Sequence, residues 1–137
     1  MGVLYRGQSI SKGAAEGIAL VTKERISYTS VDVKTGKILQ AGHELYGKIA
    51  KDMILVIPSM KANVDMWKLY WCWKEGTAPR AIVAVEADDY IIAGTTLCGI
   101  PCVHRLNSDP TKCIRSGQRI RVDGDRGVVE VLDDVSG

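Results

Sequence analysis

Three short apolar runs, separated by two helix-like segments, constrain the fold of this chain more than any other feature. The runs cover residues 53–57, 81–85 and 100–103. Apolar runs of this length between turn-forming residues are typical of strands that are covered on both faces. Because parallel strands need long crossover connections, the order strand, helix, strand, helix, strand predicts a parallel βαβαβ core.

The two connecting segments carry the signals of helix ends. Residues 64–75 contain neither glycine nor proline; Asn63 is placed to cap their start, and Gly76 provides a stop. Residues 88–98 form a second predicted helix, which begins with acidic side chains and ends at Gly99. Both helices should therefore cover the parallel sheet.

The rest of the chain favours strands and turns. Residues 18–22 and 26–28 have β character, residues 32–37 have the composition of a turn, and residues 118–131 alternate around glycines as a hairpin does. We therefore predict an α/β fold, a swivelling β/β/α domain with a β-rich first part, a βαβαβ core and a C-terminal hairpin. At 137 residues, the whole chain (1–137) should form one domain.

Charge and hydropathy exclude some partners. The chain has 18 basic and 16 acidic residues, interspersed, for a net charge of +2. Without a basic run or basic helix face, there is no electrostatic case for nucleic acid or for an anionic membrane. The apolar stretches are far shorter than the roughly 20 residues of a membrane-spanning helix, and no secretory signal is found. We expect a cytoplasmic protein.

Four cysteines raise the question of a metal. Cys72, Cys98, Cys102 and Cys113 include no pair with the two-residue gap that is typical of zinc sites. We interpret them as buried, unreactive thiols in a reducing compartment. As an alternative, Cys98, Cys102 and His104 lie within seven residues and could supply three metal ligands. We predict no metal in this chain.

The loop over residues 58–64 is the most informative candidate for a binding site. It leaves the carboxyl end of a buried strand and enters a helix, where ligands bind in open α/β sheets and where unpaired N–H groups attract anions. Lys61 adds a charge, and Ser59 and Asn63 add hydrogen-bonding groups. We predict that the loop holds a carboxylate or phosphate. The alternative is that Asn63 only caps the helix and Lys61 only faces solvent.

All three tryptophans, together with Tyr70, lie in the first predicted helix. Helical spacing places residues 67, 70, 71 and 74 on one side, whereas Trp73 points elsewhere. We favour packing of this cluster against the sheet, with Trp73 at the surface; the alternative is an aromatic face that docks a partner. His43 in the polar turn 42–44 is a weak acid–base candidate.

The order and spacing of several segments resemble the small subunit, or swivel domain, of the aconitase X family. The resembling segments cover residues 13–21, 26–28, 31–38, 43–47, 54–59 and 76–83, within about residues 7–105. The resemblance implies a swivelling β/β/α fold and hydro-lyase activity together with a large subunit that carries an iron–sulfur centre. It also implies a catalytic serine in a Gly-Arg-Gly-Ser-like loop, where this chain has residues 60–63 ending in Asn63.

We therefore predict the small subunit of an aconitase X-like hydro-lyase, with little activity on its own. It would close over the large iron–sulfur subunit and hold no cofactor itself. Ser59 and Asn63 are the candidate catalytic residues, and Lys61, Asp32 and His43 are the candidate contacts to a small anionic substrate.

The alternative is a non-catalytic mobile binding or scaffold subunit. The C-terminal part of the chain is similar to the mobile phosphohistidine domain of phosphoenolpyruvate-utilizing enzymes. Tyr90 stands where that family has its phosphorylated histidine. A phenol does not replace imidazole as a nucleophile at neutral pH, so this phosphoryl transfer is not expected.

Overall fold

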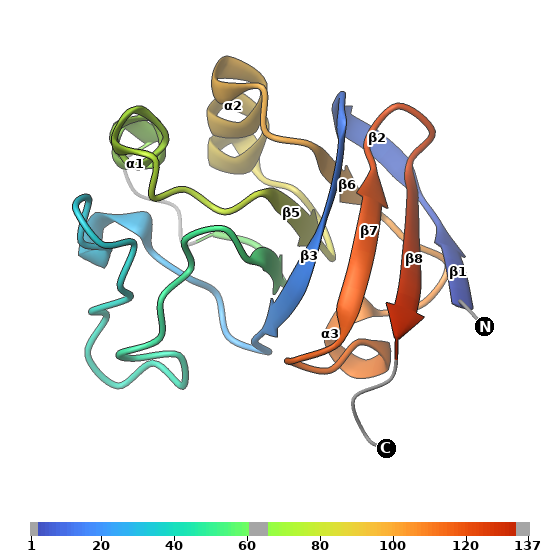
Figure 1. Cartoon of the computed structure of the whole chain (residues 1–137), viewed down its shortest axis with the longest axis horizontal. Coiled ribbons are helices and arrows are strands. Elements are labelled where there is room, and N and C mark those ends of the chain that lie inside the picture. The colour runs from blue at the N-terminus through green and yellow to red at the C-terminus, as the bar shows by residue number, and fades with distance from the viewer. Residues whose placement is uncertain (1–2, 61–65, 134–137) are drawn as a thin grey trace.

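The computed structural model describes residues 3–60 and 66–133 and contains one eight-stranded sheet with three α-helices (Figure 1). The strands are β1 (Val3–Arg6), β2 (Gln8–Ser11), β3 (Ala14–Val21), β4 (Ile54–Ile57), β5 (Ala81–Ala84), β6 (Cys102–His104), β7 (Arg119–Asp123) and β8 (Val128–Asp133). The helices are α1 (Met66–Glu75), α2 (Asp89–Cys98) and α3 (Pro110–Cys113), with a 3₁₀ turn η1 (Tyr28–Ser30).

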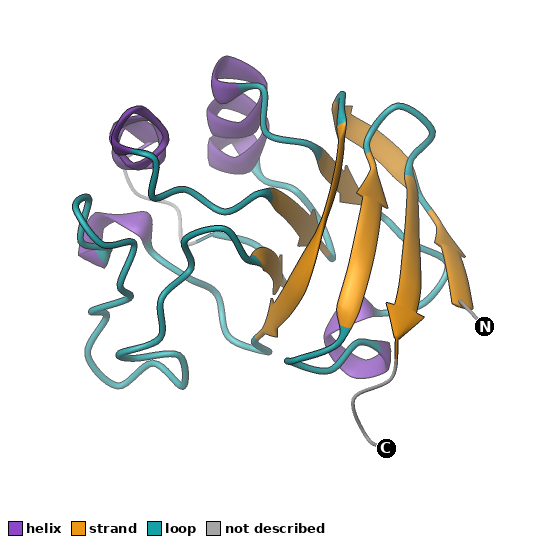
Figure 2. Cartoon of the chain, viewed as in Figure 1, coloured by secondary structure: helices purple, strands orange, loops and turns teal. Residues whose placement is uncertain are grey.

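The predicted βαβαβ core is confirmed. Strands β3, β4, β5 and β6 are neighbours and run parallel, and α1 and α2 form the crossovers after β4 and β5. Both helices lie on the same side of the sheet (Figure 2). The predicted hairpin is confirmed as the antiparallel pair β7 and β8.

Alternate residues of β4 face two separate cores. Leu55 and Ile57 pack with α1 and α2, whereas Ile54 and Val56 pack with side chains of β7 and β8 such as Ile120. A strand that is covered on both faces has no polar positions, which explains its continuous apolar run. The result is the predicted β/β/α architecture, with the β7–β8 layer on one side of the parallel strands and the helices on the other.

Two strands that the sequence did not predict curl the sheet back on itself. β1 and β2 stand at opposite ends of the strand order although only Gly7 separates them. The Gly7 N–H donates to the Gly127 carbonyl oxygen at 2.7 Å. A Cβ at position 7 would overlap the carbonyl oxygen of His104 and lie 2.9 Å from the Leu106 side chain. The close approach of these backbones therefore requires glycine.

Both ends of α2 lie at the residues that the sequence predicted. The Asp88 side chain caps α2 by accepting from the Ile91 N–H, and Gly99 ends the helix in the left-handed region with φ of 69°. Asn63, predicted to cap the first helix, lies outside the described residues. A missed helix, α3, also has local signals, because Asp109 caps it and Pro110 is its first residue.

Several strand boundaries need correction. β3 begins at Ala14 rather than at residue 18, because its first half pairs with β7. Residues 26–28 do not form a strand: Ile26 makes one isolated bridge to Met60, and Tyr28 starts η1. The strand predicted at 100–103 is β6, shifted to Cys102–His104.

The favoured interpretation of the tryptophans as core residues is wrong. Trp67, Trp71 and Trp73 are 56 %, 53 % and 43 % exposed, and we call them the tryptophan face. The core contacts of α1 come instead from Leu69 and Cys72, three residues apart on the helix. The expected surface position of Trp73 is confirmed, and Tyr70 of the same cluster does pack, partly buried, against the helix-side core.

No helix in the described part of the chain is long and apolar enough to cross a membrane.

Candidate active site at the carboxyl edge of the parallel strands

The four parallel strands all end at the same edge of the sheet, and the segments that follow them meet there. These segments begin at Thr22 after β3, at Pro58 after β4, at Val85 after β5 and at Arg105 after β6. Backbone hydrogen bonds join them: the Glu86 N–H donates to the Pro58 carbonyl at 3.1 Å, and the Arg105 N–H donates to that of Val85 at 3.2 Å. The edge is therefore one connected surface.

Arg25 is a residue of this edge that sequence reasoning missed. Its Nε donates to the Ser59 hydroxyl at 3.0 Å, and its Nη2 donates to the Met60 carbonyl oxygen at 2.9 Å. The Ile26 N–H also donates to the Ser59 carbonyl, at 3.3 Å. The segment after β3 thus holds the start of the predicted anion-binding loop. No local signal predicts this contact, because Ser59 lies 34 positions after Arg25 in the sequence.

Asp88 holds the same loop from the other side. One carboxylate oxygen accepts from the Met60 N–H at 2.9 Å, and the other accepts from the Ile91 N–H in the first turn of α2, also at 2.9 Å. The acidic side chains after β5 were interpreted as the start of the second helix. For Asp88 that is confirmed, with the added function of fixing Met60.

Glu86 and Arg105 form a bidentate ion pair across the edge. The Nε of Arg105 lies 2.9 Å from one carboxylate oxygen of Glu86, and its Nη2 lies 2.7 Å from the other. The hydrogen bond from Arg105 lowers the pKa of the Glu86 carboxyl. Arg105 has a φ of 55°, which is uncommon for a residue with a side chain. Both side chains are exposed, so the pair contributes little to stability and mainly sets the charge pattern of the edge.

His104 and His43 are both buried and both serve the backbone. The Nδ1 of His104 accepts from the Ala87 N–H at 2.9 Å, and burial lowers the pKa of the ring. The Nδ1 of His43 accepts from the Leu45 N–H at 3.0 Å, which leaves Nε2 to donate to the Arg25 carbonyl at 3.2 Å. With 6 % exposure, His43 supports the turn and Arg25. A contact from His43 to substrate stays a prediction.

The other predicted site residues divide into three groups. Ser59 and His43 are brought together through Arg25, which also lines, with His43, a hollow of about 320 Å³. Asp32 lies in a different hollow of about 420 Å³ that includes Lys68 of α1. Lys61 and Asn63 lie outside the described residues.

Asp32 organises the predicted turn over residues 32–37. Its carboxylate accepts from the Lys34 N–H at 3.0 Å and from the Thr35 hydroxyl at 3.1 Å. The Gly36 N–H closes the turn onto the Asp32 carbonyl at 2.7 Å. The turn is therefore confirmed, and the role of Asp32 toward a substrate stays a prediction.

The described residues do not fit a metal or an iron–sulfur cluster. They contain no group of three or more His, Cys, Asp or Glu side chains that could hold a metal ion. Burial raises the pKa of Cys98 to about 11 and that of Cys102 to about 12, which disfavours the thiolate that binds metals. The interpretation as buried thiols is confirmed for these two and for Cys72, whereas Cys113 is only half-buried.

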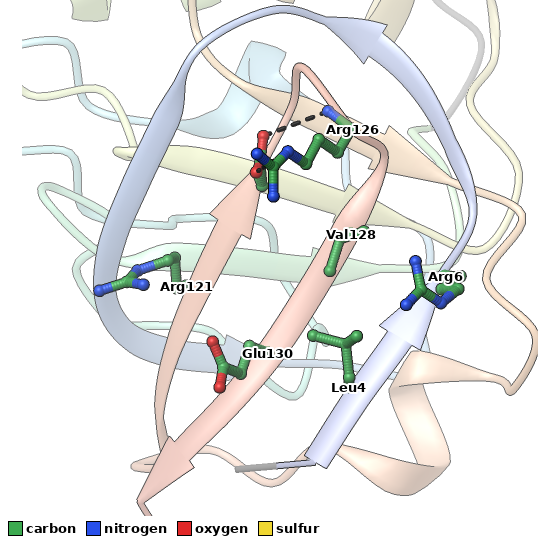
Figure 3. Close-up of a pocket in the computed structure, with 7 residues that line it drawn as sticks. Leu4, Arg6, Arg121, Arg126, Val128 and Glu130 are labelled. Atoms are coloured by element: carbon green, nitrogen blue, oxygen red, sulfur yellow. Dashed lines mark hydrogen bonds and ion pairs between the residues drawn. The ribbon is translucent and has the colours of Figure 1, made fainter.

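A further hollow lies on the outer face of β1, β8 and β7, the face that α1 and α2 do not cover (Figure 3). It measures about 210 Å³, and Leu4 and Val128 lie between the arginines around it. Two of these arginines face carboxylates: Arg121 lies 3.3 Å from Glu16, and Arg126 lies 3.8 Å from Asp123. The hollow is separate from the carboxyl edge.

Known proteins match this chain over nearly its full length. The family model described as "Aconitase X swivel domain" matches residues 4–131. The phosphomevalonate dehydratase small subunit of Methanocella arvoryzae is 38 % identical, with 92 % of this chain and 97 % of that protein covered. The corresponding protein of Thermococcus sibiricus is 39 % identical, with 92 % and 96 % covered.

A solved structure agrees with the fold. The crystal structure of Thermococcus kodakaraensis aconitase X in its holo-form superimposes with a TM-score of 0.90 at 32 % identity. The match covers 96 % of this chain and 99 % of that one. The chain belongs to the aconitase X swivel domain family.

Proposed function

We propose that this chain is the small subunit of an aconitase X-type dehydratase that acts on phosphomevalonate. The observation that carries the proposal is the match, over more than nine-tenths of both chains, to proteins named phosphomevalonate dehydratase small subunit. The activity then requires a large subunit, which would carry the iron–sulfur centre. The lack of a cluster-binding group in the described residues is consistent with that division of labour.

The substrate is expected at the carboxyl edge. Phosphomevalonate carries a phosphate and a carboxylate, and the loop 58–64 contains the cation Lys61 and lies between β4 and α1 in the sequence. Cationic side chains and helix N-termini both attract such anionic groups. Lys61 is proposed to bind one of the anionic groups. Asp32 and His43 keep their proposed place as further substrate contacts, although their hydrogen bonds to the backbone indicate supporting roles first.

Dehydration needs a base to remove a proton and a donor for the departing oxygen. Ser59 carries the only hydroxyl in the loop 58–64, and the guanidinium of Arg25 donates to its oxygen, which favours negative charge there. We propose Ser59 as the base and Asn63 as a hydrogen-bonding partner of the substrate. An amide cannot take up the proton itself.

The test is dehydration by the chain reconstituted with an aconitase X large subunit. Ser59→Ala should lower kcat at least tenfold, and Lys61→Ala should raise KM for phosphomevalonate at least tenfold. Asn63→Ala should lower kcat/KM, and Lys12→Ala, which removes an exposed cation elsewhere, is the matched control. An active pair that is indifferent to all three loop substitutions contradicts the site assignment, and a complex without dehydration contradicts the activity.

The tryptophan face supports a second candidate function, a non-catalytic docking subunit. Three large aromatic side chains on one ten-residue helix surround Tyr70, with ring centroids 5.5 to 6.2 Å from that ring. Exposed tryptophans of this kind mark protein interfaces. The two candidates share the large subunit as partner, and only the dehydratase requires turnover. A stable complex whose rate is the same with and without this chain would favour the docking subunit.

A further inference from the structure

Both backbone polar groups and the side chain of Met60, the third residue of the loop 58–64, have partners in neighbouring segments. Its carbonyl oxygen accepts from Arg25, its N–H donates to Asp88, and its side chain is 4 % exposed within the helix-side core. Arg25 and Asp88 come from the segments after β3 and β5, on either side of β4. Hydrogen bonds from neighbouring segments therefore fix the backbone of Ser59 and Met60.

The side chain of Arg25 is suited to this contact by its shape. The guanidinium is a planar fork, and two of its N–H groups reach adjacent acceptors, the Ser59 hydroxyl and the Met60 carbonyl oxygen. A lysine ammonium is a point charge without this geometry.

The backbone of Arg25 is itself held in place. Its carbonyl oxygen accepts from the buried His43 ring, and the next residue, Ile26, is buried and pairs with Met60 in an isolated bridge. The guanidinium consequently projects from a supported point. Arg25 as a whole is exposed, so truncation of its side chain leaves no cavity in either core.

We propose that Arg25 is a positioning residue that holds the Ser59 hydroxyl and the Met60 backbone in place at the carboxyl edge. The inference rests on the proposed function, because Ser59 is there proposed as the base. Catalytic and binding groups tolerate displacements of only about 0.5 Å. Loss of the Arg25 guanidinium removes the hydrogen bonds to the Ser59 hydroxyl and to the Met60 carbonyl oxygen. Substrate binding and turnover should then both be weaker.

The first test uses the reconstituted pair with Arg25→Ala and Arg25→Lys. Both variants should lower kcat by about 10- to 100-fold, the loss expected when a catalytic group moves by about 1 Å. Arg126→Ala removes an exposed arginine from the outer face of the β7–β8 layer and should leave kcat and KM unchanged. Rescue of kcat by Arg25→Lys would overturn the role of the fork, and unchanged kcat in Arg25→Ala would overturn the proposal.

The second test needs no activity and separates this inference from the proposed function. Amide hydrogen exchange followed by NMR on the chain alone should speed up at least tenfold at Ile26 and Met60 in Arg25→Ala. The exchange rate of the Ala87 amide, which donates to His104, should not change. The midpoint of urea unfolding should not change either. Unchanged exchange at Ile26 and Met60 overturns the positioning role of Arg25 even if the reconstituted pair is active. Faster exchange in Arg25→Ala together with an inactive wild-type pair supports the positioning role of Arg25 and contradicts only the proposed function.

Discussion

The tryptophan face gives a prediction whose magnitude can be worked out from the structure. Burial of a tryptophan covers up to about 250 Å², and just over half of that remains exposed at Trp67 and Trp71. Covering roughly 130 Å² per ring at about 25 cal/mol/Å² contributes about 3 kcal/mol as an upper value. The entropy lost on association reduces this contribution to binding. We therefore expect about 2–3 kcal/mol per ring, which is the range of interface hot spots.

Trp67→Ala and Trp71→Ala should therefore each weaken binding of the large subunit about 30- to 150-fold. Folding should barely change, because the rings do not belong to the cores and alanine has the higher helix propensity. We expect the free energy of unfolding to stay within about 1 kcal/mol of the wild type.

The assay is isothermal titration of the large subunit, with urea unfolding of each variant in parallel. Val3→Ala truncates an exposed apolar residue on β1 and serves as the control. A double variant Trp67→Ala/Trp71→Ala that folds normally and binds within threefold of the wild type would refute the docking role of this helix.

The remaining predictions concern stability. Tyr28→Phe should raise the free energy of unfolding by about 1 kcal/mol, because the buried Tyr28 hydroxyl has no hydrogen-bond partner among the described residues and its burial raises its pKa; a loss of stability in urea would show that the hydroxyl is bonded. The lowered pKa of His104 means that the unfolded chain binds the proton more readily, so stability should fall as pH drops below about 6.5. His104→Asn, which keeps an acceptor for Ala87, should reduce the difference between urea midpoints at pH 7.5 and 5.5, and an unaltered difference would assign it to other groups. Gly7→Ala should cost about 2–3 kcal/mol through the overlap with the His104 carbonyl, and an unchanged midpoint would show that the sheet ends are not so closely joined.

The parts of the fold that the sequence predicted are those with local causes. The apolar run of β4 follows from burial on both faces, and the ends of α2 follow from Asp88 and Gly99. β1 and β2 were missed because their side chains are mostly exposed and their pairing depends on β8 and β6, far along the chain. Long-range pairing of that kind leaves no periodic signal.

The sequence predicted where the loop leaves β4, but not which side chains contact the loop. Ser59 follows β4 at the carboxyl edge as expected, whereas Arg25 and Asp88 reach the loop from other segments. The tryptophans were misassigned because their hydrophobicity alone suggested the core, while the smaller Leu69 and Cys72 make the core contacts. Side-chain size did not decide which face of the helix was buried.

The dehydratase assignment is tested by titrating a fixed amount of an aconitase X large subunit with this chain and following phosphomevalonate dehydration by NMR. We expect no turnover by either protein alone, and a rate that rises with added chain until the two are equimolar and then stays constant. A large subunit that reaches its full rate without the chain, or an equimolar complex that forms and leaves phosphomevalonate intact, would contradict the assignment.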